Sequence, residues 1–303
     1  MIQTPVQTYD GVVAVDTKMN GLEAITAVYY LPGPRPAIVD TGPASSLEHT
    51  LAGLEAAGVE LDWIVLTHIH LDHAGACGHL SERFPDARVV VRAEGAPHLV
   101  DPSILWASAS RLFPDMEQRW GQMLPVPEDR ITAVSADTTV ADLGDGRHLE
   151  AVYAPGHARH HMALWEAGSR MLFPGDAIGV FLPGAGAFRP ATPPPEFDLK
   201  LAIDSIERLR LLGAERMYPT HFGPVPDVDR AFDEGAVEME RAVAVARHVI
   251  EAGGGIEEIA AALATARPPT SDRSASERLD RASSDHLNAA GIHRYLTKPP
   301  RRA

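Results

Sequence analysis

Short apolar runs separated by turns predict a sheet in the first third of the chain. Residues 11–15, 24–31 and 37–39 are rich in Val, Ile and Tyr, which favour strands. An amphipathic stretch over 46–57 then predicts a helix, with Ser45 or Ser46 as its N-cap and Gly58 at its end. The same patterns predict a strand at 63–66, a helix at 72–84 and a strand at 88–91.

Residues 94–130 have a different character. Prolines interrupt short helical pieces that carry many bulky apolar side chains. Helical spacing of such groups usually reflects packing. The alternative is a helical insert, about residues 95–130, whose apolar side forms one wall of a substrate pocket. Both interpretations stay open.

Strand patterns return in the second half of the chain, at 138–140, 148–153, 162–165, 171–173 and 216–218. A helix is predicted at 199–212, whereas the Pro- and Gly-rich stretch 182–195 is incompatible with regular structure. From residue 228 the pattern is helical, with breaks at 253–255 and at Pro268–Pro269. We therefore expect a domain over residues 1–227 and a C-terminal helical extension over 228–303.

A dense group of metal-ligand residues directly follows the predicted strand at 63–66. Residues 67–73 read Thr-His-Ile-His-Leu-Asp-His, which places His68, His70, Asp72 and His73 within six positions. Because alternate side chains of a strand share one face, His68 and His70 are expected to point toward one ion. Asp72 and His73, where the chain turns into a helix, can reach a second ion. Imidazole and carboxylate are ligands that zinc and similar divalent metals prefer.

Three further residues of this kind each follow a predicted strand: His157, Asp176 and His221. Each one stands beside Gly and Pro, which suits a tight turn that presents one side chain from a rigid strand. A single His or Asp at a turn is more often solvated or caps a helix. The repeated placement after apolar strands favours a joint role.

The ordered set resembles the metallo-β-lactamase-fold hydrolase superfamily, including its glyoxalase-II-like branch. The motif blocks of that family occur in order over roughly residues 10–225, with Asp40 in Val-Asp-Thr-Gly ahead of the histidine cluster. The resemblance implies an α/β (α+β) fold, a four-layer αβ/βα sandwich with a two-metal site along one edge of its inner sheets. It implies that Asp40 lies behind the ligands and orients an imidazole by a hydrogen bond. The implied ligands are His68, His70 and His157 for the first metal, Asp72, His73 and His221 for the second, and Asp176 bridging both.

The same resemblance narrows the branch of the family. His70 argues against the diiron flavoprotein variant, which typically has Glu there. The cysteine ligand of some β-lactamases is absent, which points away from the antibiotic-resistance subgroup. Cys77 is the only cysteine in the chain, so we expect it in the core, with no intrachain disulfide and a reducing compartment.

The expected cofactors are two divalent ions, Zn²⁺ in preference to Fe or Mn. Two such ions about 3.5–4 Å apart lower the pKa of a shared water from about 15.7 toward about 7. That bridging hydroxide is the expected nucleophile, since no Gly-x-Ser-x-Gly elbow is present. Asp72 is the candidate catalytic residue, because it could orient the water and pass its proton to the leaving group; simple ligation is its alternative role. Arg159, His160 or His161 could contact an anionic part of the substrate, although a solvent-exposed side chain is the simpler interpretation of Arg159.

The expected activity is hydrolysis of an ester-like bond: a thioester, a lactone or a related acyl compound with an apolar portion. The alternative is an oxidoreductase like the persulfide dioxygenases, with one iron held by two His and one Asp. A phosphodiesterase or nuclease is less expected, because the net charge of −14 and pI near 5.4 oppose a nucleic-acid partner.

No signal peptide or membrane-length apolar run is evident, so we expect a cytoplasmic location and no membrane partner. The C-terminal helices could form a homodimer contact or cap the pocket.

Overall fold

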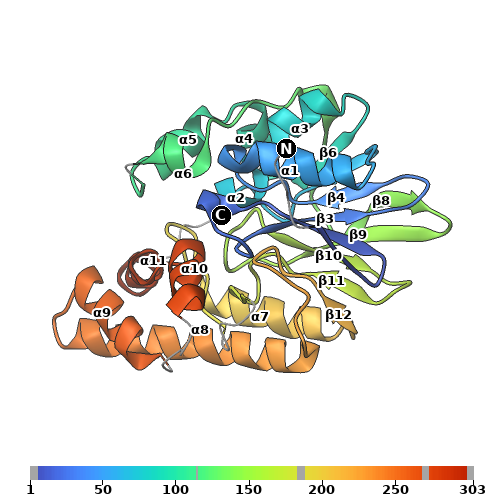
Figure 1. Cartoon of the computed structure of the whole chain (residues 1–303). Helices are drawn as coiled ribbons and strands as arrows, with labels where there is room; N and C mark the ends of the chain where they lie inside the picture. The colour runs from blue at the N-terminus through green and yellow to red at the C-terminus, as the bar shows by residue number, and fades with distance from the viewer. Residues whose placement is uncertain (1–5, 114, 183–187, 268–272, 299–303) are drawn as a thin grey trace.

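Two stacked β-sheets with helices on both outer faces form the molecule (Figure 1). The structure is a computed structural model that describes residues 6–113, 115–182, 188–267 and 273–298. One apolar cluster fills the space between the sheets, and two others lie between each sheet and its helices. The four-layer αβ/βα sandwich is therefore confirmed. The predicted break at Pro268–Pro269 and residues 183–187 of the predicted loop lie outside the described residues.

The first sheet has seven strands in the order of the chain, β1 to β7. Strands β1 to β4 pair antiparallel, and β4 to β7 pair parallel. The strands are β1 (Val6–Tyr9), β2 (Val12–Asp16), β3 (Ala27–Leu31), β4 (Ala37–Val39), β5 (Trp63–Val65), β6 (Arg88–Arg92) and β7 (Ile131–Val134). The sequence did not predict β1 and β7, which are the two edge strands. Few of their side chains are fully buried, so neither shows a clear apolar alternation.

The second sheet has five strands in the order β12-β11-β10-β9-β8, and only the β11–β12 pair is parallel. Its strands are β8 (Thr138–Gly144), β9 (Arg147–Tyr153), β10 (Met162–Glu166), β11 (Met171–Phe173) and β12 (Arg216–Met217). Aromatic rings join the two sheets: the Tyr29 ring centroid lies 5.7 Å from that of Phe173 and 5.6 Å from that of Tyr218. This packing fixes the strand ends that lead to the candidate ligands.

Short helices cover the first sheet. They are α1 (Leu47–Ala56), α2 (Leu71–Ala74), α3 (Cys77–Arg83), α4 (Ala96–Val100), α5 (Ser103–Ala109) and α6 (Met116–Trp120), with 3₁₀ turns at Met19–Gly21, Ala44–Ser46 and Glu128–Arg130. The single helix predicted over 72–84 is wrong, because the chain forms α2 and α3 instead. The Ala76 N–H leaves the helical pattern and donates to the Gly42 carbonyl at 3.0 Å. Cys77 is buried as expected, and burial raises the pKa of its thiol to about 12.

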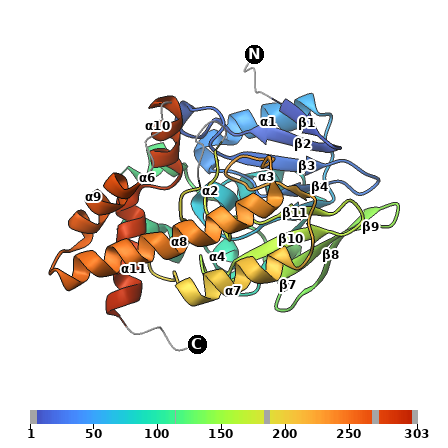
Figure 2. The ribbon, with the colours of Figure 1, turned by 90° about the horizontal axis from the view of Figure 1, so that it is seen from below.

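Five helices lie in the C-terminal third of the chain. They are α7 (Leu199–Arg210), α8 (Val228–Glu251), α9 (Ile256–Ala266), α10 (Arg273–Ala282) and α11 (Asp285–Thr297). Helices α7 and α8 cover the second sheet, and α9, α10 and α11 lie to one side of it, as Figure 2 shows from below. Side-chain oxygens of Asp198, Asp227 and Ser284 cap the N-termini of α7, α8 and α11. The helical C-terminal extension is thus present, and a domain boundary at residue 227 stays a prediction. Among the described helices, none has the uninterrupted apolar length that a membrane span requires.

Candidate metal centre

All seven predicted ligands lie at one edge of the sandwich, beyond the ends of β5, β9, β11 and β12. The reasoning from strand alternation is wrong in detail, because β5 ends at Val65. His68 and His70 therefore stand on the loop that joins β5 to α2. That loop turns both imidazoles toward the same point. Asp72 and His73 lie in α2, at the helix start that the sequence predicted.

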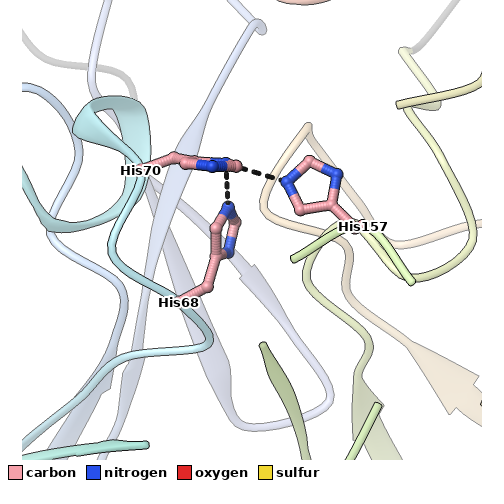
Figure 3. Close-up of side chains that lie close together, drawn as sticks. All are labelled: His68, His70 and His157. Atoms are coloured by element: carbon pink, nitrogen blue, oxygen red, sulfur yellow. Dashed lines mark hydrogen bonds between the residues drawn. The ribbon is translucent and has the colours of Figure 1, made fainter. Parts of the chain in front are cut away.

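Three imidazoles from two distant segments form the first group, which we call the three-histidine group: His68, His70 and His157. The Nδ1 atom of His70 lies 2.9 Å from His68 Nε2 and 2.8 Å from His157 Nε2 (Figure 3). The His157 Nδ1–H donates to the Ala191 carbonyl at 2.9 Å, which leaves Nε2 as the free acceptor. The three nitrogens thus face one common position.

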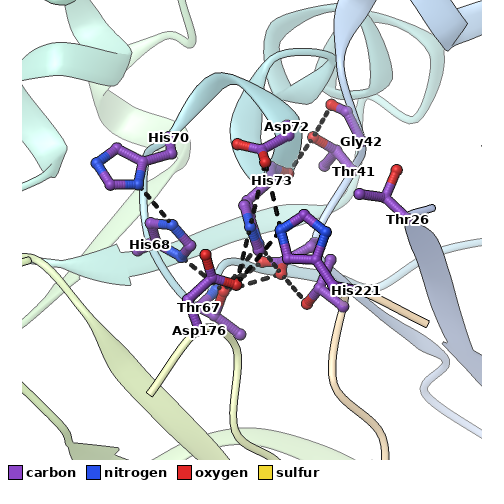
Figure 4. A network of polar contacts seen from close by, with 12 residues as sticks. Thr26, Thr41, Gly42, Thr67, His68, His70, Asp72, His73, Asp176 and His221 are labelled. Carbon is purple, nitrogen blue, oxygen red and sulfur yellow. Dashed lines mark hydrogen bonds and ion pairs between the residues drawn. The ribbon is translucent and has the colours of Figure 1, made fainter. Parts of the chain in front are cut away.

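The second group, which we call the mixed group, comprises Asp72, His73 and His221. Asp72 Oδ2 lies 3.4 Å from His221 Nε2 and 3.8 Å from His73 Nε2 (Figure 4). The His221 Nδ1–H donates to the Ile25 carbonyl at 3.2 Å, so its Nε2 also faces the cluster. The ligand atoms of this group lie within 4.8 Å of one another.

Asp176 lies between the two groups. Its Oδ2 is 3.6 Å from His157 Nε2, and its Oδ1 is 3.3 Å from His73 Nε2 and 3.6 Å from His221 Nε2. One carboxylate oxygen therefore faces each group. This is the position that the resemblance implies for a bridging ligand.

Buried polar atoms without hydrogen-bond partners show that the cluster fits a cation. Within the described residues, these atoms include His73 Nε2, His221 Nε2 and Asp176 Oδ1. Each such atom costs about 1–3 kcal/mol if it stays unsatisfied. A divalent ion would supply the missing partner for all three, and imidazole with carboxylate is a donor set that such ions accept.

Asp40 lies directly behind the mixed group, as the resemblance implied. Its side chain is fully buried, and its Oδ2 accepts from His73 Nδ1 at 2.8 Å. It also accepts hydrogen bonds from the Thr67 backbone N–H at 2.7 Å and from the Thr220 hydroxyl at 2.6 Å. These contacts hold the proton of His73 on Nδ1 and leave Nε2 directed at the cluster.

The two groups differ in electrostatics. Burial lowers the pKa of every imidazole in the three-histidine group, and neighbouring imidazoles lower the pKa of His68 and His70 further. Burial also acts downward on His73 and His221, but the carboxylates of Asp176 and Asp72 raise the pKa of both. For Asp72, burial favours the neutral acid, yet His73 and His221 lower its pKa to about 2. The first group is therefore neutral and the second forms an ion-paired set.

His161, which the sequence offered only as a possible contact for a substrate anion, has a different place in the structure. His161 is fully buried, and its Nε2 accepts from the Asp176 backbone N–H at 3.1 Å, so it fixes the turn that presents Asp176. Arg159, considered for substrate anions, forms an ion pair with Glu196 at 2.7 Å. The spacing of these residues in the sequence carries no signal for either contact.

A cavity of about 320 Å³ leads to the cluster. His70, Asp72, His157 and Asp176 lie at its inner end. The insert contributes an apolar wall with Ile104, Leu105, Leu112 and Phe113, while α10, α11 and residues 191–196 line other sides. Leu105 and Phe113 also pack on the core, so both interpretations of the insert apply. The C-terminal helices contribute to the cavity; a homodimer contact stays a prediction.

The sequence profile described as the metallo-beta-lactamase superfamily matches residues 22–221. The chain belongs to this superfamily. It is 30% identical over 189 residues to the metallo-beta-lactamase fold-containing protein ST1585 of Sulfurisphaera tokodaii. The aligned region covers 61% of this chain and 67% of that protein. The crystal structure of ST1585 superposes with a TM-score of 0.68 at 26% identity, over 89% of this chain and 93% of that one.

Two other relatives are named for reactions of acyl compounds. A hydroxyacylglutathione hydrolase of Aeromonas salmonicida is 31% identical over 180 residues, which cover 58% of this chain and 52% of that protein. The acyl-coenzyme A thioesterase MBLAC2 of Gallus gallus is 27% identical over 132 residues, 42% of this chain and 46% of that protein. The chain thus matches about half of the length of these two relatives.

Proposed function

We propose that the protein is a metal-dependent hydrolase that cleaves an ester-like bond in a thioester, a lactone or a related acyl compound. The observation that supports this proposal is the position of Asp176 between two groups of candidate ligands at the inner end of the cavity. The names of the acyl-hydrolysing relatives support the same class of substrate.

The three-histidine group would hold one divalent ion, the mixed group a second, and Asp176 would contact both. Divalent ions there, Zn²⁺ in the first instance, would supply an acidified water and polarise an acyl carbonyl. Hydrogen bonds from Nδ1 of His73, His157 and His221 fix these imidazoles with Nε2 toward the cluster. The chain itself therefore orders the ligands before an ion arrives.

Asp72 is the proposed catalytic side chain. Its side chain is 14% exposed and lines the cavity, and its low pKa keeps it ionised at neutral pH. An ionised carboxylate at this place can accept a hydrogen bond from the attacking water, orient it, and carry a proton toward the leaving group. Asp176 also faces the cavity, but both of its oxygens point to imidazoles of the cluster.

The apolar wall of the insert suits a substrate with an apolar portion. Ile104 and Leu112 are 66% and 42% exposed although both line the cavity, so they have surface to offer a ligand. Other parts of the cavity lining contribute Pro193, Pro194 and Leu287. A small acyl compound would therefore meet apolar side chains from several segments, with its reactive carbonyl toward Asp72.

The test is metal analysis of freshly purified protein together with assays on thioesters, lactones and phosphodiesters. We expect two zinc ions per chain and turnover of an acyl substrate. The variants His68→Ala and Asp176→Ala should lose metal and activity together. One iron per chain with oxygen consumption would instead favour the dioxygenase alternative, and full turnover by either variant would contradict the proposal.

A further inference from the structure

The segment whose backbone accepts a hydrogen bond from His157 is itself hydrogen-bonded to the C-terminal helices. Residues 189–192, which we call the support segment, lie within the Pro- and Gly-rich stretch 182–195 and run past the candidate metal centre. The Ala191 carbonyl of this segment accepts the hydrogen bond from His157 Nδ1 at 2.9 Å. The position of Ala191 therefore decides how the His157 imidazole is held.

Asn288, on α11, holds the support segment on both sides of Ala191. Its side-chain Oδ1 accepts from the Thr192 backbone N–H and from the Thr192 hydroxyl, each at 2.8 Å. Its Nδ2 donates to the Ser283 hydroxyl at 2.8 Å, and that hydroxyl donates to the Pro190 carbonyl at 2.8 Å. Both neighbours of Ala191 are thus tied to the same asparagine, one directly and one through Ser283.

These hydrogen bonds are shielded from water. Thr192 is fully buried, Asn288 is 2% exposed and Ser283 is 4% exposed. Water cannot easily replace a bond lost there, so the backbone N–H of Thr192 would stay unsatisfied without the Asn288 side chain. The Thr192 hydroxyl would keep the backbone carbonyl of residue 288 as an acceptor, at 3.3 Å. Helix α11 also approaches the support segment closely at Gly291, where a Cβ atom would lie 1.7 Å from the Thr192 carbonyl oxygen.

We propose that Asn288 is a positioning residue of the metal centre. By fixing Pro190 and Thr192, it keeps the Ala191 carbonyl where it accepts from His157 Nδ1, and so keeps His157 Nε2 directed at the ion. This inference rests on the proposed function, in which His157 is a ligand. The C-terminal extension then takes part in metal binding as well as in shaping the cavity.

Zinc titration of the metal-free full-length protein tests this proposal. The variant His157→Ala should fail to bind one of the two ions, which identifies the ion that His157 holds. Asn288→Ala should bind that ion about 10- to 100-fold more weakly than wild type does, the usual effect of losing a residue that orients a ligand. Asn288→Asp keeps the acceptor for both Thr192 donors and should bind zinc more tightly than Asn288→Ala. The nitrogen-15 NMR signal of the His157 Nδ1–H should be lost from Asn288→Ala and kept in Asn288→Asp.

Ser284→Ala is the matched control. It removes the N-cap of the same helix, whose hydroxyl oxygen accepts from the Leu287 backbone N–H at 3.2 Å. The hydroxyl of Ser284 is not among the groups that bind the support segment, which are those of Asn288 and Ser283. Ser284→Ala should lower thermal stability without changing zinc affinity. A purely structural role of Asn288 would give the same result as this control.

The outcomes separate the two proposals. If His157→Ala binds zinc as wild type does, the assignment of His157 as a ligand is wrong, and the proposed function with it. If His157→Ala loses an ion but folded Asn288→Ala binds it with wild-type affinity and keeps the imidazole signal, only the role of Asn288 is wrong. Gly291→Ala would disrupt the contact between α11 and the support segment in a second way, because its Cβ atom would collide with the Thr192 carbonyl oxygen. It should lower the affinity for the same ion.

Discussion

Asp40 is a fully buried carboxylate that connects three separate parts of the chain behind the mixed group. Replacing it by Ala would leave the donors on Thr67, His73 and Thr220 without an acceptor. We expect Asp40→Ala to lower the free energy of unfolding by about 3–5 kcal/mol, the usual cost of breaking a buried charged pair. Chemical denaturation of the metal-free protein measures this, with Asp40→Asn as the milder comparison. A loss below about 0.5 kcal/mol, the size of an ordinary surface substitution, would contradict this role.

Metal binding should also release protons from one group only. In the metal-free protein the carboxylates of Asp176 and Asp72 raise the pKa of His73 and His221, so each keeps its second ring proton to a higher pH than a free imidazole does. A cation must displace these protons, and its affinity for the mixed group should therefore rise with pH. The three-histidine group has lowered pKa values and releases none. Zinc calorimetry at pH 7 in buffers of different ionisation enthalpy tests this, and a heat independent of the buffer would contradict it.

The candidate ligands could be predicted from the sequence because each lies in a recognisable motif that follows a strand. The residues that orient those ligands could not be predicted from the sequence. Asn288 acts on a segment 96 residues earlier in the chain, and His161 accepts from Asp176 through a backbone N–H. Such contacts depend on the packing of elements, which local residue patterns do not contain.

Helix α5 contributes Ile104 and Leu105 to the apolar wall of the cavity. Ile104 is 66% exposed and lines the cavity, so its side chain contributes little to the core. We expect Ile104→Ala to lower kcat/KM about tenfold for acyl substrates with a long apolar chain, as loss of a few methylene contacts would, and to leave stability unchanged. Substrates with short acyl chains should be affected less.

Leu211→Ala is the control for this substitution, because Leu211 is 87% exposed and is not among the residues that line the cavity. It should leave kcat/KM unchanged for every substrate. An equal loss in Ile104→Ala for short and long acyl chains would contradict contact between Ile104 and the substrate.

Most elements could be predicted from apolar periodicity, and the failures have physical causes. Strands β1 and β7 are edge strands with few buried side chains, so their patterns are weak. The division of the predicted helix into α2 and α3 depends on a long-range bond from Ala76 to Gly42. At Gly75 a Cβ atom would lie 2.3 Å from the Leu71 carbonyl oxygen, which shows how tightly this break is packed.

The candidate metal centre brings together segments that follow strands of both sheets. Ions bound there should stabilise the folded chain, because unfolding separates the ligands. At a free zinc concentration 100 times the Kd, the gain is about 2.7 kcal/mol, or roughly 5–10 °C in Tm. Thermal unfolding with and without a chelator measures this. An unchanged Tm would contradict binding by the folded state.

The C-terminal extension is part of the same assembly. Phe232 and Met239 of α8 and Ile292 of α11 share one buried cluster with Val152 and Trp165 of the second sheet. The sequence predicted helices here but could not place them, because an amphipathic pattern does not name the surface that it covers. Their position beside the cavity follows only from the packing of α10 and α11 near residues 191–196.

Anomalous X-ray diffraction at the zinc edge, from crystals of the zinc-loaded protein, would locate the bound ions directly. We predict two anomalous peaks, one among His68, His70 and His157 and one among Asp72, His73 and His221, with the Asp176 carboxylate between them. The absence of a peak at these side chains, or a peak only elsewhere in the molecule, would contradict the account.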